Sequence, residues 1–171
     1  MIRNLLTFAL LATTVAGSAA PSFAMDRGHA ELLGALQARG ITLYNDADLC
    51  EKNPDLDGFY HGASRSLVVC AEGSWENLSE NDLDTIRHES VHFMQDCANG
   101  SIDGNLRRVL KPGQAHSMLA STGQNPNWIA EVYTSKGKGD HVPYEEEAFG
   151  IAAAVPPGTI TSALNIFCPL P

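Results

Sequence analysis

The sequence predicts an α+β protein, in which a helix and a small sheet precede a long central helix and a second helical part. Three observations support this fold class. Apolar residues recur at helical spacing in several segments, and two short segments are rich in β-branched residues. One long helical segment also carries its own capping signal.

The segment before the central helix is expected to contain one helix and two strands. Residues 27–39 form the helix, because three leucines share one side and Gly40 follows as a stop signal. Residues 41–45 look like a short strand. Residues 46–64 are rich in Asp, Asn, Gly and Pro and are expected to be loop, whereas the branched residues of segment 65–71 predict a second strand.

Residues 80–98 are expected to form the central helix. Ser79 and Asp82 are spaced as the N-cap and N3 residues of a capping box, and acid in the first turn suits the helix dipole. No proline interrupts the segment, and Asn99-Gly100 follows as a stop signal.

The C-terminal part is expected to be helical. In chain order its helices cover residues 106–110, 115–120, 127–136 and 144–154. A flexible loop at residues 137–140 separates the last two. Pro156-Pro157 stops the last helix, and a tail follows as far as Cys168.

Residues 1–24 resemble a secretory signal peptide. Arg3 precedes an apolar stretch, and small residues lead to a cleavage site after Ala24. The apolar stretch is too short for membrane insertion, and no later segment could span a bilayer. We therefore expect a secreted or periplasmic protein with a single domain over residues 25–171.

The charge and the cysteines narrow the class of protein further. The formal net charge is −9, so nucleic acid is not expected as a partner. The four cysteines predict two disulfides in an exported chain. Their order favours pairing Cys50 with Cys70 and Cys97 with Cys168. The sequence does not indicate an oligomeric state.

Residues 88–92 read His-Glu-Ser-Val-His, which matches the pattern His-Glu-x-x-His. On a helix, His88 and His92 lie one turn apart and can present two imidazole nitrogens to one metal ion. Glu89 lies beside them, where a carboxylate can reach a water molecule without binding the metal. The pattern therefore predicts a zinc-dependent hydrolase.

A hydrolytic zinc site of this kind needs a third protein ligand. The metzincin pattern is excluded, because Gln95 and Ala98 occupy the positions of its glycine and third histidine. The remaining candidates lie downstream of the central helix. They are His141, Glu145, Glu146 and Glu147.

With these motifs the sequence resembles the gluzincin zinc metallopeptidases, which combine His-Glu-x-x-His with a glutamate on a later helix, often followed by alanine in Glu-x-x-Ala. The resemblance covers these two motifs and their order. It implies a minimal zincin-like fold and one Zn²⁺ held by His88, His92 and Glu145, with Ala148 as the small residue. It also implies Glu89 as the general base and a peptide or protein as the substrate.

The resemblance has further implications and one departure. Gluzincins place a strand at the edge of the substrate cleft, and residues 65–71 take that position here. Candidate donors to the transition state are His141, Tyr144 and Tyr133. Many gluzincins have Asp or Asn directly after the alanine to support a ligand histidine, whereas this chain has Phe149. Another residue must then orient the imidazole.

Two alternatives and one weaker motif remain. A non-catalytic binding module could retain the scaffold, and a zinc hydrolase could act on a bond other than a peptide. Residues 53–58 resemble the first half of a Ca²⁺ loop, but Ser64 replaces the glutamate expected at the twelfth position. A plain turn is favoured there over calcium.

Overall fold

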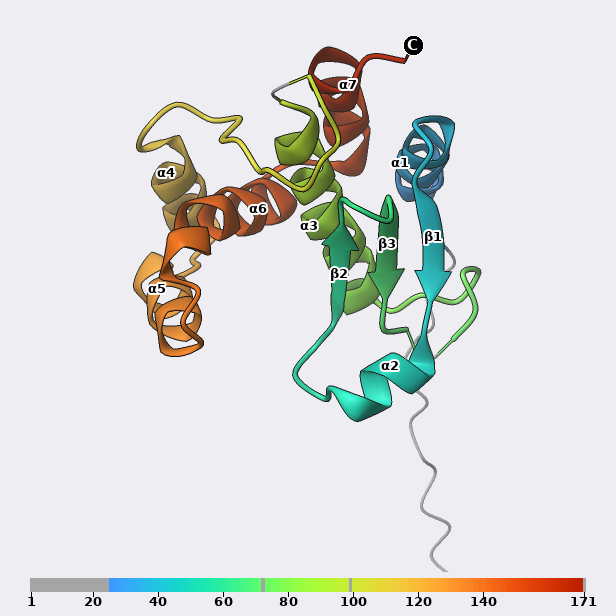
Figure 1. Cartoon of the computed structure of the whole chain (residues 1–171), viewed down its shortest axis with the longest axis horizontal. Coiled ribbons are helices and arrows are strands. Elements are labelled where there is room, and N and C mark those ends of the chain that lie inside the picture. The colour runs from blue at the N-terminus through green and yellow to red at the C-terminus, as the bar shows by residue number, and fades with distance from the viewer. Residues whose placement is uncertain (1–24, 72, 99, 171) are drawn as a thin grey trace, which may run out of the picture.

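The central helix, α3 (Glu80–Cys97), separates a sheet from a group of helices (Figure 1). The structure is a computed structural model that describes residues 25–71, 73–98 and 100–170. The predicted signal peptide, residues 1–24, lies outside the described residues. The fold is α+β, as the sequence predicted.

The elements before α3 are α1 (Arg27–Ala38), β1 (Thr42–Asn45), α2 (Ala47–Lys52), β2 (Gly58–His61) and β3 (Ser66–Val69). Those after it are α4 (Gln114–Ser121), α5 (Pro126–Ser135), the 3₁₀ helix η1 (Gly139–His141), α6 (Val142–Ala154) and α7 (Pro157–Phe167). The predicted helices at 27–39, 80–98, 115–120, 127–136 and 144–154 are confirmed as α1, α3, α4, α5 and α6. The predicted strands at 41–45 and 65–71 are confirmed as β1 and β3.

The sheet has the strand order β1-β3-β2, with β1 parallel and β2 antiparallel to β3. All four residues of β3 are buried. The prediction that residues 65–71 form the edge of the cleft is therefore wrong, because β3 pairs on both sides. The edge strand that contacts α3 is β2, within the segment that was predicted to be a loop.

Helix α3 begins as its sequence predicted. The Asp82 N–H donates to the Ser79 hydroxyl at 3.1 Å, and the Asp82 carboxylate accepts from the Ser79 N–H at 2.7 Å. Most of the helix is buried, because it packs against β2 and β3 on one side and against α6 and α7 on the other. Its buried apolar residues, including Ile86 and Phe93, join those of α1 and α7 in one core.

The prediction of a loop over residues 46–64 is wrong, because α2 and β2 form there. Asp46 caps α2 by accepting from the Leu49 N–H at 2.9 Å. One of the Asp residues in segment 46–64 is therefore a helix cap, although composition alone predicts a loop there. Strand β2 is stabilised by pairing with β3, and local sequence does not encode such a partner.

Residues 106–110 do not form the predicted helix. The N–H groups of Val109 and Leu110 donate to the Glu147 carboxylate, at 2.9 and 3.3 Å. The Arg107 N–H donates to the Gln95 carbonyl at 2.9 Å. These N–H groups bond to other elements, so a tertiary interaction overrides the local preference for helix.

The chain also forms a helix where a tail was predicted. Pro156 and Pro157 end α6, but they are the N-cap and the first residue of α7. Proline is tolerated there because the first N–H groups of a helix have no partner within it. The loop predicted at residues 137–140 likewise runs into η1.

The two disulfides join Cys50 to Cys70 and Cys97 to Cys168, the pairing that the sequence order favoured. The second ties the end of α3 to the end of α7 across 71 residues of sequence. Among the helices of the described ranges, none has the length and apolar character needed to cross a membrane.

Candidate metal centre

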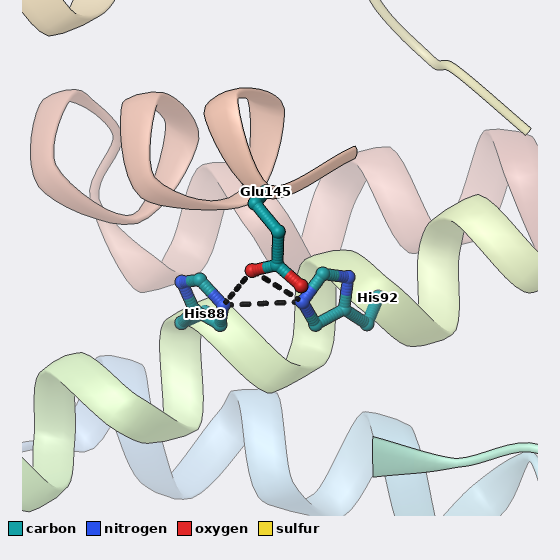
Figure 2. Close-up of side chains that lie close together, drawn as sticks. All are labelled: His88, His92 and Glu145. Carbon is teal, nitrogen blue, oxygen red and sulfur yellow. Dashed lines mark hydrogen bonds and ion pairs between the residues drawn. The ribbon is translucent and has the colours of Figure 1, made fainter. Parts of the chain in front are cut away.

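Three side chains from two helices converge beside α3 (Figure 2). His88 and His92 lie one turn apart on α3, and their Nε2 atoms are 3.1 Å apart. Glu145, in the first turn of α6, brings its Oε2 atom to 3.2 Å from His88 Nε2 and 3.4 Å from His92 Nε2. The three atoms thus form a nearly equilateral triangle.

This geometry fits a metal ion. Tetrahedral zinc ligands at metal distances of about 2.0–2.1 Å are separated from one another by about 3.3 Å. Glu145 Oε2 is also buried, and it makes no hydrogen bond to any group in the described ranges. A buried oxygen without a partner is costly, and a cation bound at this position would satisfy it. The cluster of His88, His92 and Glu145 could therefore hold a metal ion.

The electrostatics of the cluster favour positive charge. Burial disfavours the charged form of His92, but the Glu145 carboxylate and the charge of Glu89 outweigh it and raise its pKa to about 9. Burial likewise disfavours ionised Glu145, yet the two histidines hold the pKa of that carboxyl well below its usual range. The negative charges of Glu145 and Glu89 therefore lie close to the two imidazole nitrogens and favour a cation there.

Small residues let α6 approach its neighbours. Ala148 is fully buried in the core between α6 and α3. A Cβ atom on Gly150 would lie only 3.2 Å from the Ala115 carbonyl oxygen of α4. Pro143 in the first turn of α6 fixes its start, so Glu145 is presented one turn into the helix.

The other three candidates for the third ligand lie elsewhere. Glu146 pairs with His116 at 3.4 Å, and Glu147 is buried among donors from residues 108–110. His141 is exposed, with its ring centroid 6.5 Å from that of Tyr144. The structure thus brings Glu145, and none of these three, to the two histidines.

Glu89 lies beside the cluster and is held by the sheet. Its side chain is buried, and its Oε2 atom accepts the Tyr60 N–H of β2 at 2.7 Å. Together with His88 it lines a cleft of about 520 Å³. The cleft is bounded by β2, α3, α5 and α6. Its walls include Gly58, Trp128, Tyr133 and Phe149.

Of the three predicted donors, Tyr133 lines this cleft, whereas His141 and Tyr144 do not. Burial raises the pKa of the Tyr133 hydroxyl, and the negative charges of Glu145 and Glu89 raise it further. Tyr133 therefore keeps its proton at neutral pH and remains a hydrogen-bond donor beside the cluster.

Two residues that the sequence analysis did not assign to the site hold the histidines. Gln95 has its Oε1 atom 2.8 Å from His92 Nδ1. Phe149 packs its ring edge-on against His88, at a centroid distance of 4.4 Å. The spacing of Gln95 three residues after His92, on the same face of a helix, is the signal that could have identified it.

The calcium pattern is not completed in the structure. Residues 53–56 form the plain turn that the sequence favoured, in which the Leu56 N–H donates to the Asn53 carbonyl at 2.9 Å. Residues 58–61, in the middle of the twelve-residue pattern, are strand β2. Ser64, at its last position, bonds to His61 Nδ1 and Ser66 Oγ, both at 2.7 Å. An extended strand cannot wrap its side chains around a cation as the predicted loop requires.

Comparison with curated proteins and with solved structures found no match for this chain. A family model does match, over residues 22–169. Since the match covers most of the sequence, the chain belongs to the family described as "Domain of unknown function (DUF8637)".

Proposed function

We propose that this protein is an exported, zinc-dependent endopeptidase. One observation carries the proposal. The ligand atoms of His88, His92 and Glu145 are separated by 3.1–3.4 Å, as in a tetrahedral site, and Glu89 lines the same cleft as His88. The sequence resemblance to gluzincins rests on the same residues and supports the same function.

The donor set favours zinc over calcium and magnesium. Calcium and magnesium prefer oxygen ligands alone, whereas two imidazoles and one carboxylate are a common zinc set in hydrolases. His88 faces the cleft, which gives water and a substrate access to the cluster. When bound, zinc supplies a Lewis acid that activates water and polarises a carbonyl group.

Glu89 is suited to accept the proton of the attacking water. The hydrogen bond from the Tyr60 N–H fixes one of its oxygens and leaves the other able to accept a proton. Because Glu89 follows His88 directly on α3, its distance from the cluster is set by the helix itself. The carboxylate can then deliver that proton to the leaving amine.

Tyr133 is suited to stabilise the negative charge that develops on the carbonyl oxygen. Its hydroxyl stays protonated, and it lines the cleft opposite α3. A donor that is already oriented in a partly buried cleft is worth more than the same donor in water. We assign this role to Tyr133 in preference to His141 and Tyr144.

An extended peptide is the substrate that the cleft favours. β2 is an edge strand, and its first residue, Gly58, lines the cleft. Edge strands bind extended peptides through main-chain hydrogen bonds. The disulfides and the signal-like N-terminus support export, so the substrate would be extracellular or periplasmic.

The alternative is a binding module without catalysis. The hydrogen bond between Tyr60 and Glu89 gives this carboxylate a structural role that such a module would also use. Glu89→Gln separates the two functions, because glutamine accepts the same N–H but cannot act as a general base.

The test combines metal analysis with hydrolysis. Elemental mass spectrometry of the dialysed mature protein should find one zinc per chain in wild type and in Glu89→Gln, but not in Glu145→Ala. Cleavage of a mixture of quenched fluorescent peptides should occur only with wild type. Zinc without cleavage by wild type would favour the binding module, and cleavage by Glu89→Gln would exclude the proposed mechanism.

A further inference from the structure

The two histidines of the cluster are held in different ways. His88 lies at the cleft and is contacted by the Phe149 ring. His92 lies deeper, and its Nδ1 atom is 2.8 Å from the Oε1 atom of Gln95. Gln95 is fully buried, so water does not compete for this contact.

The direction of the hydrogen bond follows from the other end of Gln95. Its Nε2 atom lies 2.9 Å from the Tyr144 carbonyl oxygen and 3.2 Å from Glu147 Oε2. A carbonyl oxygen can only accept, so the amide N–H₂ must face Tyr144 and Glu147. Gln95 Oε1 therefore faces His92 and must accept a hydrogen bond from the protonated Nδ1.

This direction determines which nitrogen of His92 is available to a metal. When Nδ1 carries the proton, the neutral imidazole has its lone pair on Nε2. Nε2 is the nitrogen that faces His88 and Glu145. The amide of Gln95 thus selects the form of His92 that can bind a metal at the cluster.

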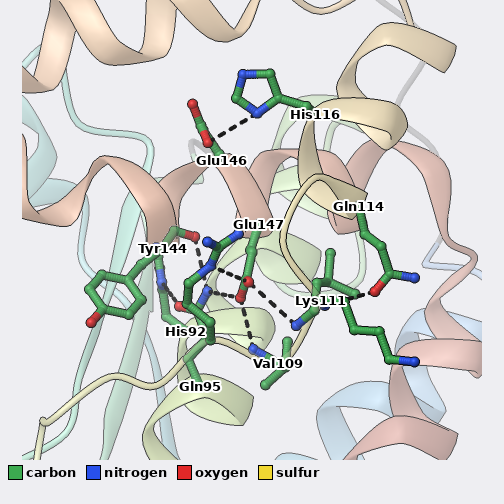
Figure 3. A network of polar contacts seen from close by, with 11 residues as sticks. His92, Gln95, Val109, Lys111, Gln114, His116, Tyr144, Glu146 and Glu147 are labelled. Carbon is green, nitrogen blue, oxygen red and sulfur yellow. Dashed lines mark hydrogen bonds and ion pairs between the residues drawn. The ribbon is translucent and has the colours of Figure 1, made fainter.

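Glu147 holds Gln95 in this orientation (Figure 3). Its carboxylate is fully buried and accepts from Arg108 Nε at 2.8 Å, in addition to the N–H groups of Val109 and Leu110. Glu146, the next residue along, instead points toward His116. A buried carboxylate with this many donors is fixed in place, and the segment of residues 108–110 is fixed with it.

We propose that Gln95 is a positioning residue that holds His92 ready to bind the metal through Nε2, and that Glu147 keeps the Gln95 amide in the required orientation. The inference rests on the metal site of the proposed function, but not on peptidase activity. In this chain Gln95 takes the part that an Asp or Asn at the position of Phe149 would play in the gluzincins it resembles.

Zinc affinity, measured by competition with a chromophoric chelator, tests the role of Gln95. Gln95→Leu should bind zinc roughly 10- to 100-fold more weakly than wild type, because it leaves Nδ1 without an acceptor. Gln114→Leu is the matched control, since exposed Gln114 accepts only from the Lys111 N–H at 2.7 Å. Its zinc affinity should not change.

A double variant separates positioning from a merely structural contact. Glu147→Gln alone places an amide against the Gln95 amide and should weaken zinc binding. Gln95→Glu combined with Glu147→Gln restores an acceptor for His92 and an acceptor for the new amide, with the net charge unchanged. The double variant sets a carboxylate oxygen against the Tyr144 carbonyl oxygen and the new amide nitrogen against the Val109 N–H. Affinity that recovers despite these two losses therefore reports on His92 and not on the tie between α3 and α6.

The cobalt-substituted proteins give a second readout. The visible spectrum of Co²⁺ depends on its ligand geometry, so the double variant should match wild type and Gln95→Leu should differ. Wild-type zinc affinity in a folded Gln95→Leu overturns the positioning role and leaves the metal site in place. If Gln95→Leu does not fold, Gln95→Met takes its place, because methionine has nearly the same length as glutamine and no strong acceptor. Wild-type zinc affinity in folded Gln95→Met then overturns the positioning role.

Failure of the proposed function gives a different result. If wild type binds zinc but cleaves no peptide, the proposed peptidase activity is wrong. The positioning role is then decided by the zinc affinities above. Wild type that binds no zinc overturns the metal site and the role of Gln95 together.

Discussion

The two sides of α3 are built from different interactions. On the sheet side, apolar side chains predominate, as where the Phe93 ring packs against Tyr60 at a centroid distance of 5.8 Å. On the α6 side, α3 and α6 bury polar groups against each other, among them Gln95, Glu145 and Glu147. The sheet side therefore provides stability and holds Glu89 through Tyr60, whereas the α6 side provides the candidate metal ligands.

This difference indicates how a small domain can support a buried polar site. Burying carboxylates costs free energy unless each has partners, and Glu147 has them within the chain. Glu145 Oε2 makes no hydrogen bond within the described residues and lies only near the two histidine nitrogens, at 3.2 and 3.4 Å, so a metal bound among them would be its partner. Truncation of apolar residues on the sheet side should thus lower stability and leave metal affinity intact. Removal of a metal ligand on the α6 side should lower metal affinity and leave the stability of the metal-free protein intact.

The largest effect on stability is expected from Phe93→Ala. Phe93 is fully buried, so its truncation should lower the free energy of unfolding by about 3–5 kcal/mol. Chemical denaturation of the metal-free protein measures this loss, and the folded variant should still bind zinc. Ile166→Ala, at a residue 76% exposed, is the control and should change stability by less than about 0.5 kcal/mol. A loss of zinc binding in folded Phe93→Ala would contradict the division between the two sides.

The second effect concerns the α6 side. Zinc at 100 times its dissociation constant should stabilise wild type by about 2.7 kcal/mol, because only the folded chain forms the site. Glu145→Ala should lose this stabilisation while its metal-free stability stays close to that of wild type. Denaturation curves with and without zinc measure both quantities, and Glu146→Ala should behave like wild type. If zinc stabilised Glu145→Ala as much as wild type, the metal would bind at another site.

The third effect tests the edge of the cleft. A Cβ atom on Gly58 would lie 2.5 Å from the Val68 carbonyl oxygen of the neighbouring strand. Gly58→Ala should therefore cost about 1–3 kcal/mol of stability, since the two strands must move apart. Gly34→Ala, at an exposed helical position with no atom within 4 Å of the new Cβ, should instead stabilise the protein by about 0.5–1 kcal/mol. Thermal unfolding of both variants checks the contrast in sign.

The smallest effect is expected at the start of α3. Ser79→Ala removes the hydroxyl of the capping box and should cost about 1 kcal/mol. The histidines are more than two turns away, so zinc affinity should remain that of wild type. Ser79→Thr keeps a hydroxyl that can accept from the Asp82 N–H and donate to the Asp82 carboxylate, so it should retain the stability. A change in zinc affinity in Ser79→Ala would show that the start of α3 sets the geometry of the cluster.

Most helices could be predicted from the sequence. The segments that were predicted wrongly depend on contacts with distant parts of the chain. α3, α5 and α6 carry local signals such as caps, apolar spacing and stop residues, and all three form where expected. β2 and the irregular segment around Val109 depend on partners far along the chain, namely β3 and Glu147. Such partners are not visible in a local window of sequence.

The sequence by itself determined the spacing of His88, Glu89 and His92, because one helical turn places them and the helix signals of α3 are local. Only the tertiary structure decided between Glu145, Glu146 and Glu147. Successive residues of a helix point about 100° apart, so the side chain that reaches the histidines depends on how α6 is rotated against α3. That rotation is set by packing at Ala148 and Gly150 and by the buried bonds of Glu147, which the order of residues alone does not reveal.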